Sequence, residues 1–135
     1  MDIEECIQWL LKGSRIFGEY FYAALFERHP PLKEFFQGAD MKQQSVLLTM
    51  QLTVIGQCHS GTLPAVDAYL QNLGIAHKRR GIPIEAYQGF RDVLLETLEQ
   101  FLGPLWEDDL SSQWSDAINA ASQKMLEGYE KDFHV

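Results

Sequence analysis

The sequence predicts an all-α protein, and three observations support this prediction. Apolar residues recur at intervals of three and four, which is the period of a helix with one buried face. Segments that alternate between apolar and polar residues, as a half-buried strand would, are few. Glycine and proline stand between the periodic segments, and no linker separates them, so we expect one domain spanning residues 1–135.

Six helices and one extra turn follow from the periodic segments. Gly13 is expected to end the first helix in the left-handed conformation, and Pro30 removes a helical donor after the second. Thr62 is expected to cap the fourth helix, Gly81 to end it, and Pro83 to open the fifth. The expected helices cover about residues 3–11, 15–28, 42–58, 63–80 and 83–102, the last helix starts near residue 107, and the extra turn covers residues 32–36.

Composition and charge exclude several classes of partner. Eleven Lys and Arg against nineteen Asp and Glu leave a formal net charge of -8, so neither nucleic acid nor a membrane is an expected partner. The basic cluster Lys78–Arg80 is typical of the cationic end of a helix. The N-terminus is acidic and no apolar run approaches the roughly 18 residues of a membrane span, so we expect a cytoplasmic protein. Cys6 and Cys58 lack a metal-type spacing and are expected to be free thiols.

The candidate chemistry centres on one histidine. No paired carboxylates, Ser/His/Asp order, glycine-rich phosphate loop or zinc-type cluster is present, so hydrolytic and phosphoryl-transfer enzymes are not indicated. His77 follows Leu70 and Leu73 on the apolar face of its helix, which directs its imidazole inward. A buried imidazole needs a hydrogen-bond partner or a metal. The pattern alone leaves both an ordinary core histidine and a metal ligand open.

Several segments resemble the globin family. The stretch Leu73–Pro83 is similar to the proximal histidine region of bacterial single-domain globins, flavohaemoglobin haem domains and neuroglobins, with His77 on the haem-ligating position. Tyr87 matches the tyrosine that flavohaemoglobins place beside that ligand. Upstream, the segment Tyr20–Phe36 resembles the second helix, the corner proline and the haem-contacting phenylalanine of the family. This resemblance covers about residues 17–125 and implies a globin fold, a 3-over-3 helical sandwich with a short first helix.

The resemblance also implies a haem b whose iron is bonded to His77, with the other face left for O2, NO or CO. Tyr22 matches the tyrosine whose hydroxyl points at bound oxygen, and Gln44 is its expected distal partner. Gln43 and Ser45 stay open as alternatives to Gln44, because the register of this helix is not fixed by the sequence. Both donors would stabilise the negative charge on bound oxygen. The apolar residues expected to surround the haem are Phe36, Leu47, Leu48, Val54, Val66, Leu70, Leu73, Ile82, Phe90 and Leu94.

On the proximal side, the second nitrogen of His77 needs a partner that fixes the ring and tunes the iron. The candidates are the carbonyl of Leu73 and the side chain of Tyr87. In flavohaemoglobins a glutamate from the last helix joins this tyrosine. The equivalent position here is Tyr129, and Glu130 takes that role only if the helix is shifted by one residue.

A tyrosine and glutamine pocket predicts slow oxygen release, which suits storage, scavenging or oxygen-dependent chemistry better than transport. In relatives with this distal pair, oxygen reacts with nitric oxide to give nitrate. The sequence up to Val135 has no dinucleotide-binding fingerprint, so turnover is expected to need a separate reductase. Lys78–Arg80 is a candidate contact for haem propionates or for that partner. The alternatives are a haem-based gas or redox sensor that acts through a partner, and a haem-free globin-fold adaptor.

Overall fold

The computed structural model describes residues 1–13, 16–61 and 63–131. Within these residues it contains no strand, so the predicted all-α class is confirmed. None of the described helices is both long and apolar enough to cross a membrane. The elements, in chain order, are α1 Ile3–Lys12, α2 Ile16–Arg28, η1 Pro30–Phe36, α3 Met41–Gln57, η2 Cys58–Ser60, α4 Pro64–Arg79, α5 Ala86–Leu102, η3 Gly103–Leu105 and α6 Asp108–Lys131.

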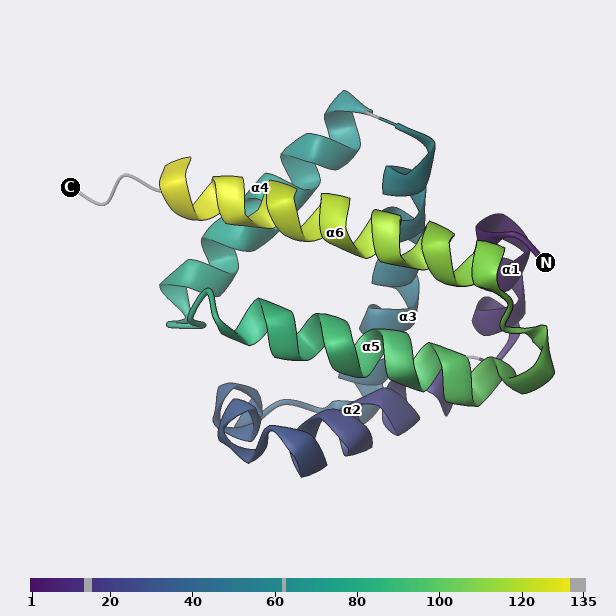
Figure 1. Cartoon of the computed structure of the whole chain (residues 1–135). Helices are drawn as coiled ribbons and strands as arrows, with labels where there is room; N and C mark the ends of the chain where they lie inside the picture. The colour runs from purple at the N-terminus through teal and green to yellow at the C-terminus, as the bar shows by residue number, and fades with distance from the viewer. Residues whose placement is uncertain (14–15, 62, 132–135) are drawn as a thin grey trace.

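The helices are arranged in two layers (Figure 1). One layer contains α2, α5 and α6, in which α5 lies between the other two. The other contains α1, α3 and α4, which cross behind the first layer; α3 packs against α1, α2 and α6, and α4 packs extensively against α6. This three-over-three arrangement with a short first helix is the one that the sequence predicted.

The hydrophobic core lies between the two layers. Trp114 and Phe21 are fully buried, and each large apolar side chain buried in this way contributes roughly 1.5–3 kcal/mol to folding. The face of α6 that points into the core carries apolar residues at helical spacing. They include Leu110, Trp114, Ala117, Ala121 and Met125.

The crossing of α4 and α6 is unusually close. A Cβ atom on Gly74 would lie 1.8 Å from the carbonyl oxygen of Met125, and one on Gly128 would lie 2.2 Å from the carbonyl oxygen of Gln71. Either contact is far inside van der Waals distance, so a side chain at these positions would force the helices apart. The two glycines therefore let the backbones of α4 and α6 touch.

One predicted helix cap, at Gly13, needs correction, and another, at Thr62, lies outside the described residues. Gly13 has φ -79° and is right-handed, so the expected left-handed cap is wrong. Its N–H bonds the carbonyl of Leu10, and its carbonyl accepts the N–H of Ile16, so a tight right-handed turn satisfies these groups. Thr62, the expected cap of α4, lies outside the described residues, and the N-cap position is occupied by Leu63 without a capping side-chain bond.

The predicted start of α5 at Pro83 is also wrong, since the helix begins at Ala86. Gly81, with φ +84°, reverses the chain after α4, as expected of a glycine at this position. The N–H of Ile82 then bonds the carbonyl of His77, and a turn up to residue 85 follows before the helix starts. This corner between α4 and α5 holds the backbone of Ile82 next to the end of α4.

Candidate functional site

His77 lies in the last turn of α4 and is half-buried. Its Nδ1 atom is 2.8 Å from the hydroxyl oxygen of Tyr87, so its observed partner is Tyr87 and not the carbonyl of Leu73. Burial, together with the charge of Arg80, lowers the pKa of His77, which favours the neutral ring. Nε2 forms no hydrogen bond with any residue that the structure describes, and its lone pair is free to ligate a metal when Nδ1 carries the proton.

The contact of Tyr87 with α6 is an aromatic one. The rings of Tyr87 and Tyr129 meet edge-on, with their centroids 5.7 Å apart. The Tyr129 hydroxyl donates to the carbonyl oxygen of Ile82 at 2.8 Å. Burial raises the pKa of both tyrosines, so both are neutral at pH 7. We call His77, Tyr87, Tyr129 and the Ile82 carbonyl the proximal cluster.

The fold brings these four groups together from α4, the corner after it, α5 and α6. Tyr129 directly follows Gly128, so the close crossing of α4 and α6 places its ring beside the corner. Lys78 holds it there, because its Nζ donates to the Tyr129 carbonyl at 3.0 Å. The residue that contacts Tyr87 is therefore Tyr129, whereas Glu130, the alternative raised by a one-residue shift, is exposed.

On the other side, Tyr22 and Gln44 lie next to each other where α2 crosses α3. A Cβ atom on Gly18 would lie 2.4 Å from the carbonyl oxygen of Ser45, so the two backbones touch there. Ser45 is buried in this crossing and Gln43 is exposed, whereas Gln44 donates from Nε2 to the Tyr22 hydroxyl at 3.2 Å. Of the three residues that the sequence left open, Gln44 is thus the one beside Tyr22.

The Tyr22 side chain is held by aromatic neighbours. It is only 5% exposed, packs edge-on to Phe36 with centroids 5.2 Å apart, and stacks on Phe26 at 5.8 Å. Burial raises the pKa of Tyr22, which outweighs the opposite effect of the hydrogen bond from Gln44. The phenol therefore stays protonated. Because Gln44 donates to its oxygen, the Tyr22 proton is left for another acceptor.

His77 lies on α4, whereas Tyr22 and Gln44 lie on α2 and α3. Among the described residues, α4 packs against α6 and makes no extensive contact with α2, α3 or α5. The apolar residues predicted to surround a prosthetic group differ in their exposure to solvent. Leu48, Leu70 and Leu94 are buried; Phe36, Val54, Val66, Leu73, Ile82 and Phe90 are half-buried; and Leu47 is 46% exposed.

These residues fit a flat apolar group that brings its own metal ligands. In the part of the chain that the structure describes, no cluster of His, Cys, Asp and Glu could hold a bare metal ion. His77 supplies a single nitrogen, so a metal bound there needs further ligands from a prosthetic group. The half-buried apolar side chains supply the surface that such a group would cover.

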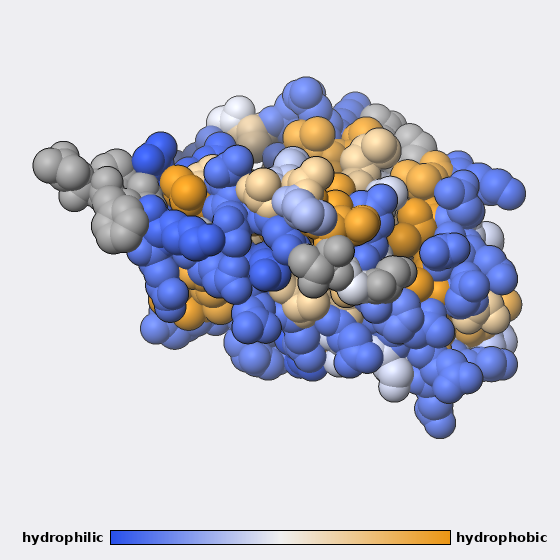
Figure 2. Space-filling model, turned by 90° about the horizontal axis from the view of Figure 1, so that it is seen from above, coloured by the Kyte–Doolittle hydropathy of each residue, from blue (hydrophilic) through white to orange (hydrophobic). Residues whose placement is uncertain are grey.

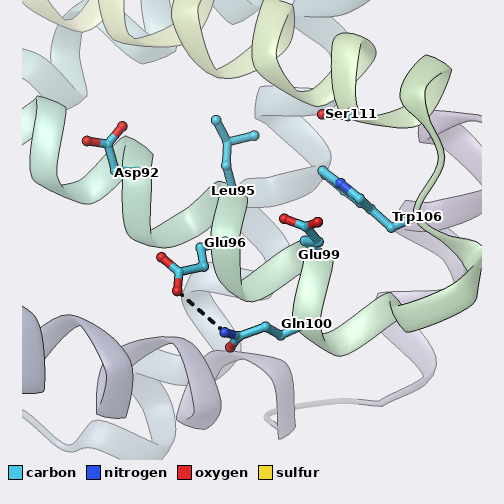
Figure 3. A pocket seen from close by; sticks show the side chains of 7 residues that line it. All are labelled: Asp92, Leu95, Glu96, Glu99, Gln100, Trp106 and Ser111. Carbon is cyan, nitrogen blue, oxygen red and sulfur yellow. Dashed lines mark hydrogen bonds between the residues drawn. The ribbon is translucent and has the colours of Figure 1, made fainter.

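Two surface grooves are found on the described part of the molecule. The groove in Figure 3 is lined by the carboxylates of Asp92, Glu96 and Glu99 together with Trp106, and none of the predicted site residues lines it. A second groove, between α5 and α6, includes Tyr87 in its lining. The face in Figure 2 is mostly hydrophilic, with hydrophobic residues in patches between the polar ones.

The sequence missed the residues that act through their backbone or through their small size. Ile82 was predicted only as an apolar contact, whereas its carbonyl accepts the hydrogen bond of Tyr129 in the proximal cluster. Nothing in a side-chain pattern indicates the role of a backbone carbonyl. Gly18, Gly74 and Gly128 did leave a signal, because a glycine inside a predicted helix has a cost that points to a packing reason.

The structure is a two-layered helical protein, with the imidazole of His77 at the end of α4 and the paired side chains of Tyr22 and Gln44 where α2 crosses α3. A family model described as Globin matches residues 19–125. The chain belongs to the globin family.

Three relatives illustrate the similarity. A leghemoglobin of Psophocarpus tetragonolobus is 24% identical over 117 residues, which is 81% of this chain and 80% of the relative. An uncharacterized globin-like protein of Aquifex aeolicus is 24% identical over 105 residues, covering 78% and 73% of the two chains. A flavohemoprotein of Rhizobium meliloti is 24% identical over 117 residues, covering 86% of this chain. The match spans only 29% of that flavohemoprotein.

Proposed function

We propose that this globin binds haem b through Nε2 of His77 and takes up O2 and other diatomic gases on the opposite face. The observation that carries the proposal is the asymmetry of His77. Its Nδ1 atom is bonded to Tyr87 and its Nε2 atom has no partner among the described residues. An imidazole held in this way presents one nitrogen to a metal and cannot rotate without breaking a hydrogen bond.

The apolar residues named above would hold the haem, chiefly by excluding water from the iron. The haem would supply an iron centre that binds diatomic gases reversibly. Oxygen gains negative charge when it binds ferrous iron, and the Tyr22 proton and the Gln44 amide are the donors that would face it. Carbon monoxide gains less charge and would benefit less. We therefore expect slow oxygen release, in keeping with storage, scavenging or oxygen-dependent chemistry.

Replacement of His77 tests the proposal. The protein expressed with ample haem should be coloured, whereas His77→Ala should lose normal haem retention and recover it in part with added imidazole. His59→Ala is a matched control, since His59 is exposed in η2 and should leave the spectrum unchanged. The measurement is the absorption of the ferric, ferrous and carbonyl forms. A colourless wild-type protein would reject the proposal and favour a haem-free adaptor.

A second candidate function is nitric oxide dioxygenation. The paired donors Tyr22 and Gln44 and the similarity to a flavohemoprotein favour it. In this reaction NO and O2 combine to nitrate while the iron gives up one electron, and a separate reductase must return that electron. Oxygen-loaded protein mixed with NO should yield one nitrate for each haem, with continued turnover only when a reductase is added. Dissociation of O2 without nitrate would reject this function and leave gas binding intact.

A further inference from the structure

The two surface grooves are consecutive stretches of one surface. One is lined by the first half of α5 and the second half of α6, and the other by the second half of α5 and the start of α6. Because α5 and α6 lie side by side and run in opposite directions (Figure 1), the grooves follow each other along the helix pair. We call this surface, from Ile84 and Glu130 at one end to Glu99 and Trp106 at the other, the α5–α6 furrow.

The furrow has the dimensions of a helix. α5 contains 17 residues, so the furrow is about 25 Å long at a rise of about 1.5 Å per residue. The two grooves have volumes of about 660 Å³ and 820 Å³, more than an ion or a small amine would fill. Ile84 is 53% exposed, and Leu95, Trp106 and Leu126 are half-buried. An occupant that is itself a helix with an apolar stripe fits this shape.

The unpaired charges of the furrow are negative and lie at both of its ends. Glu85 and Glu130 at one end and Glu99 at the other are exposed, and none of them forms an ion pair or a side-chain hydrogen bond with a described residue. Among the described residues that line the furrow, Arg91 is the one base, and Asp92 lies 3.2 Å from its guanidinium. The furrow therefore attracts positive charge at both ends.

One end also carries the two groups that together recognise a cationic side chain. The Glu99 carboxylate and the Trp106 ring project into the same groove (Figure 3). A carboxylate attracts an ammonium or guanidinium group, and the face of an indole ring attracts the same cation. Glu85 lies about 21 Å from Glu99 along the axis of α5, so a docked helix would need basic residues about 14 positions apart.

We propose that the α5–α6 furrow docks a basic amphipathic helix of a partner protein, with Lys or Arg near both ends and apolar residues between them. A second copy of this chain fits poorly, because its net charge of -8 and its own furrow would bring carboxylates against carboxylates. Nucleic acid is repelled for the same reason. The inference goes beyond the proposed function and does not depend on haem.

A synthetic helical peptide of Leu and Lys, about 18 residues long with Lys near both ends, spans the furrow and serves as the probe. Added to the whole chain, it should shift the amide NMR signals along α5 and α6, whereas the same peptide with Glu in place of Lys should not. The triple variant Glu85→Gln, Glu99→Gln, Glu130→Gln should bind the Lys peptide about tenfold more weakly, as expected of three exposed ion pairs.

Matched variants separate the furrow from net charge. Glu4→Gln, Glu5→Gln, Glu34→Gln removes the same charge at exposed positions elsewhere, and screening should keep its affinity within about twofold of wild type. Ile84→Ser should weaken binding about fivefold, because it removes part of the apolar contact. Met50→Ser, at a residue of similar exposure on α3, should leave the affinity unchanged.

Three results would overturn the inference. Equal losses in the two triple variants would show that net charge alone attracts the peptide. Equal binding of the Glu peptide, or amide shifts spread beyond the furrow, would show that the furrow does not select a basic helix. Shifts along α5 and α6 that depend on protein concentration without any peptide would assign the furrow to a second copy of the chain.

Discussion

At the scale of single residues, the function proposed here depends on which hydrogen-bond donors remain unused. Tyr22 is buried among aromatic rings, and Gln44 already donates to its oxygen. Gln44 therefore does not accept the Tyr22 proton, which remains free for a bound ligand. Its energetic contribution will be largest for a ligand that gains negative charge, because a hydrogen bond is stronger in a pocket of low dielectric constant.

Replacing Tyr22 by phenylalanine should speed oxygen release. We expect the O2 dissociation rate to rise by about tenfold to a hundredfold, since one hydrogen bond to a charged ligand is lost, while the CO rate changes little. Stopped-flow replacement of O2 by CO measures the first rate and NO displacement the second. Tyr20→Phe, two residues earlier on α2 and exposed, is the control. Equal changes for O2 and CO would indicate an altered cavity and contradict a role in hydrogen bonding.

The two cysteines, both free thiols as expected, should differ in reactivity. Cys6 is fully buried, and this burial raises its pKa to about 11 although Trp114 donates to its sulfur at 3.3 Å. A raised thiol pKa suppresses the thiolate, so at pH 8 only about one Cys6 in a thousand is reactive. Iodoacetamide should therefore label the half-buried Cys58 first in the native protein, with both labelled after unfolding. Mass spectrometry of the peptides checks this, and early labelling of Cys6 would show that α1 opens readily.

At the scale of elements, glycines decide how closely the helices cross. The crossing of α4 and α6 at Gly74 and Gly128 lies one turn before His77 and next to Tyr129. The same contact therefore supports both His77 and Tyr129 of the proximal cluster. In the same way, the crossing of α2 and α3 at Gly18 supports Tyr22 and Gln44.

Gly74→Ala should destabilise the protein by about 3 kcal/mol, because the added Cβ would overlap the Met125 carbonyl and this outweighs the helix propensity of alanine. Gly13→Ala is the matched control. Gly13 has a right-handed backbone and its Cβ would meet only the Leu10 carbonyl oxygen at 3.4 Å, so we expect no loss and a gain of up to about 1 kcal/mol. Urea unfolding measures both. Equal stability of the two variants would mean that α4 and α6 can separate freely.

The elements also show how far the sequence could predict the structure. The core stripe of α6 and the end of α4 at Gly81 follow from local periodicity and backbone preference, and the structure has both. The start of α5 was misplaced because proline at the first turn is also typical of a turn outside a helix. Local patterns fix which segments are helical but leave their ends uncertain.

At the scale of the whole molecule, helical periodicity predicted the all-α class and the family resemblance implied the arrangement of the helices, and both were confirmed. The family resemblance supplied His77, Tyr22 and Tyr87 as candidate site residues, and the helix crossings bring them to two sides of the layers. The role of the Ile82 carbonyl could not be predicted, since Tyr129 of α6 reaches it only in the folded chain.

The attachment of α4 has one more consequence. Because α4 packs against α6 and not extensively against α2, α3 or α5, any pull on His77 when a gas binds would be passed to α6 through the glycine crossing. A partner that distinguishes the gas-bound from the gas-free molecule would then contact the outer surface of α6. A small rotation of this helix would change which side chains are available for docking.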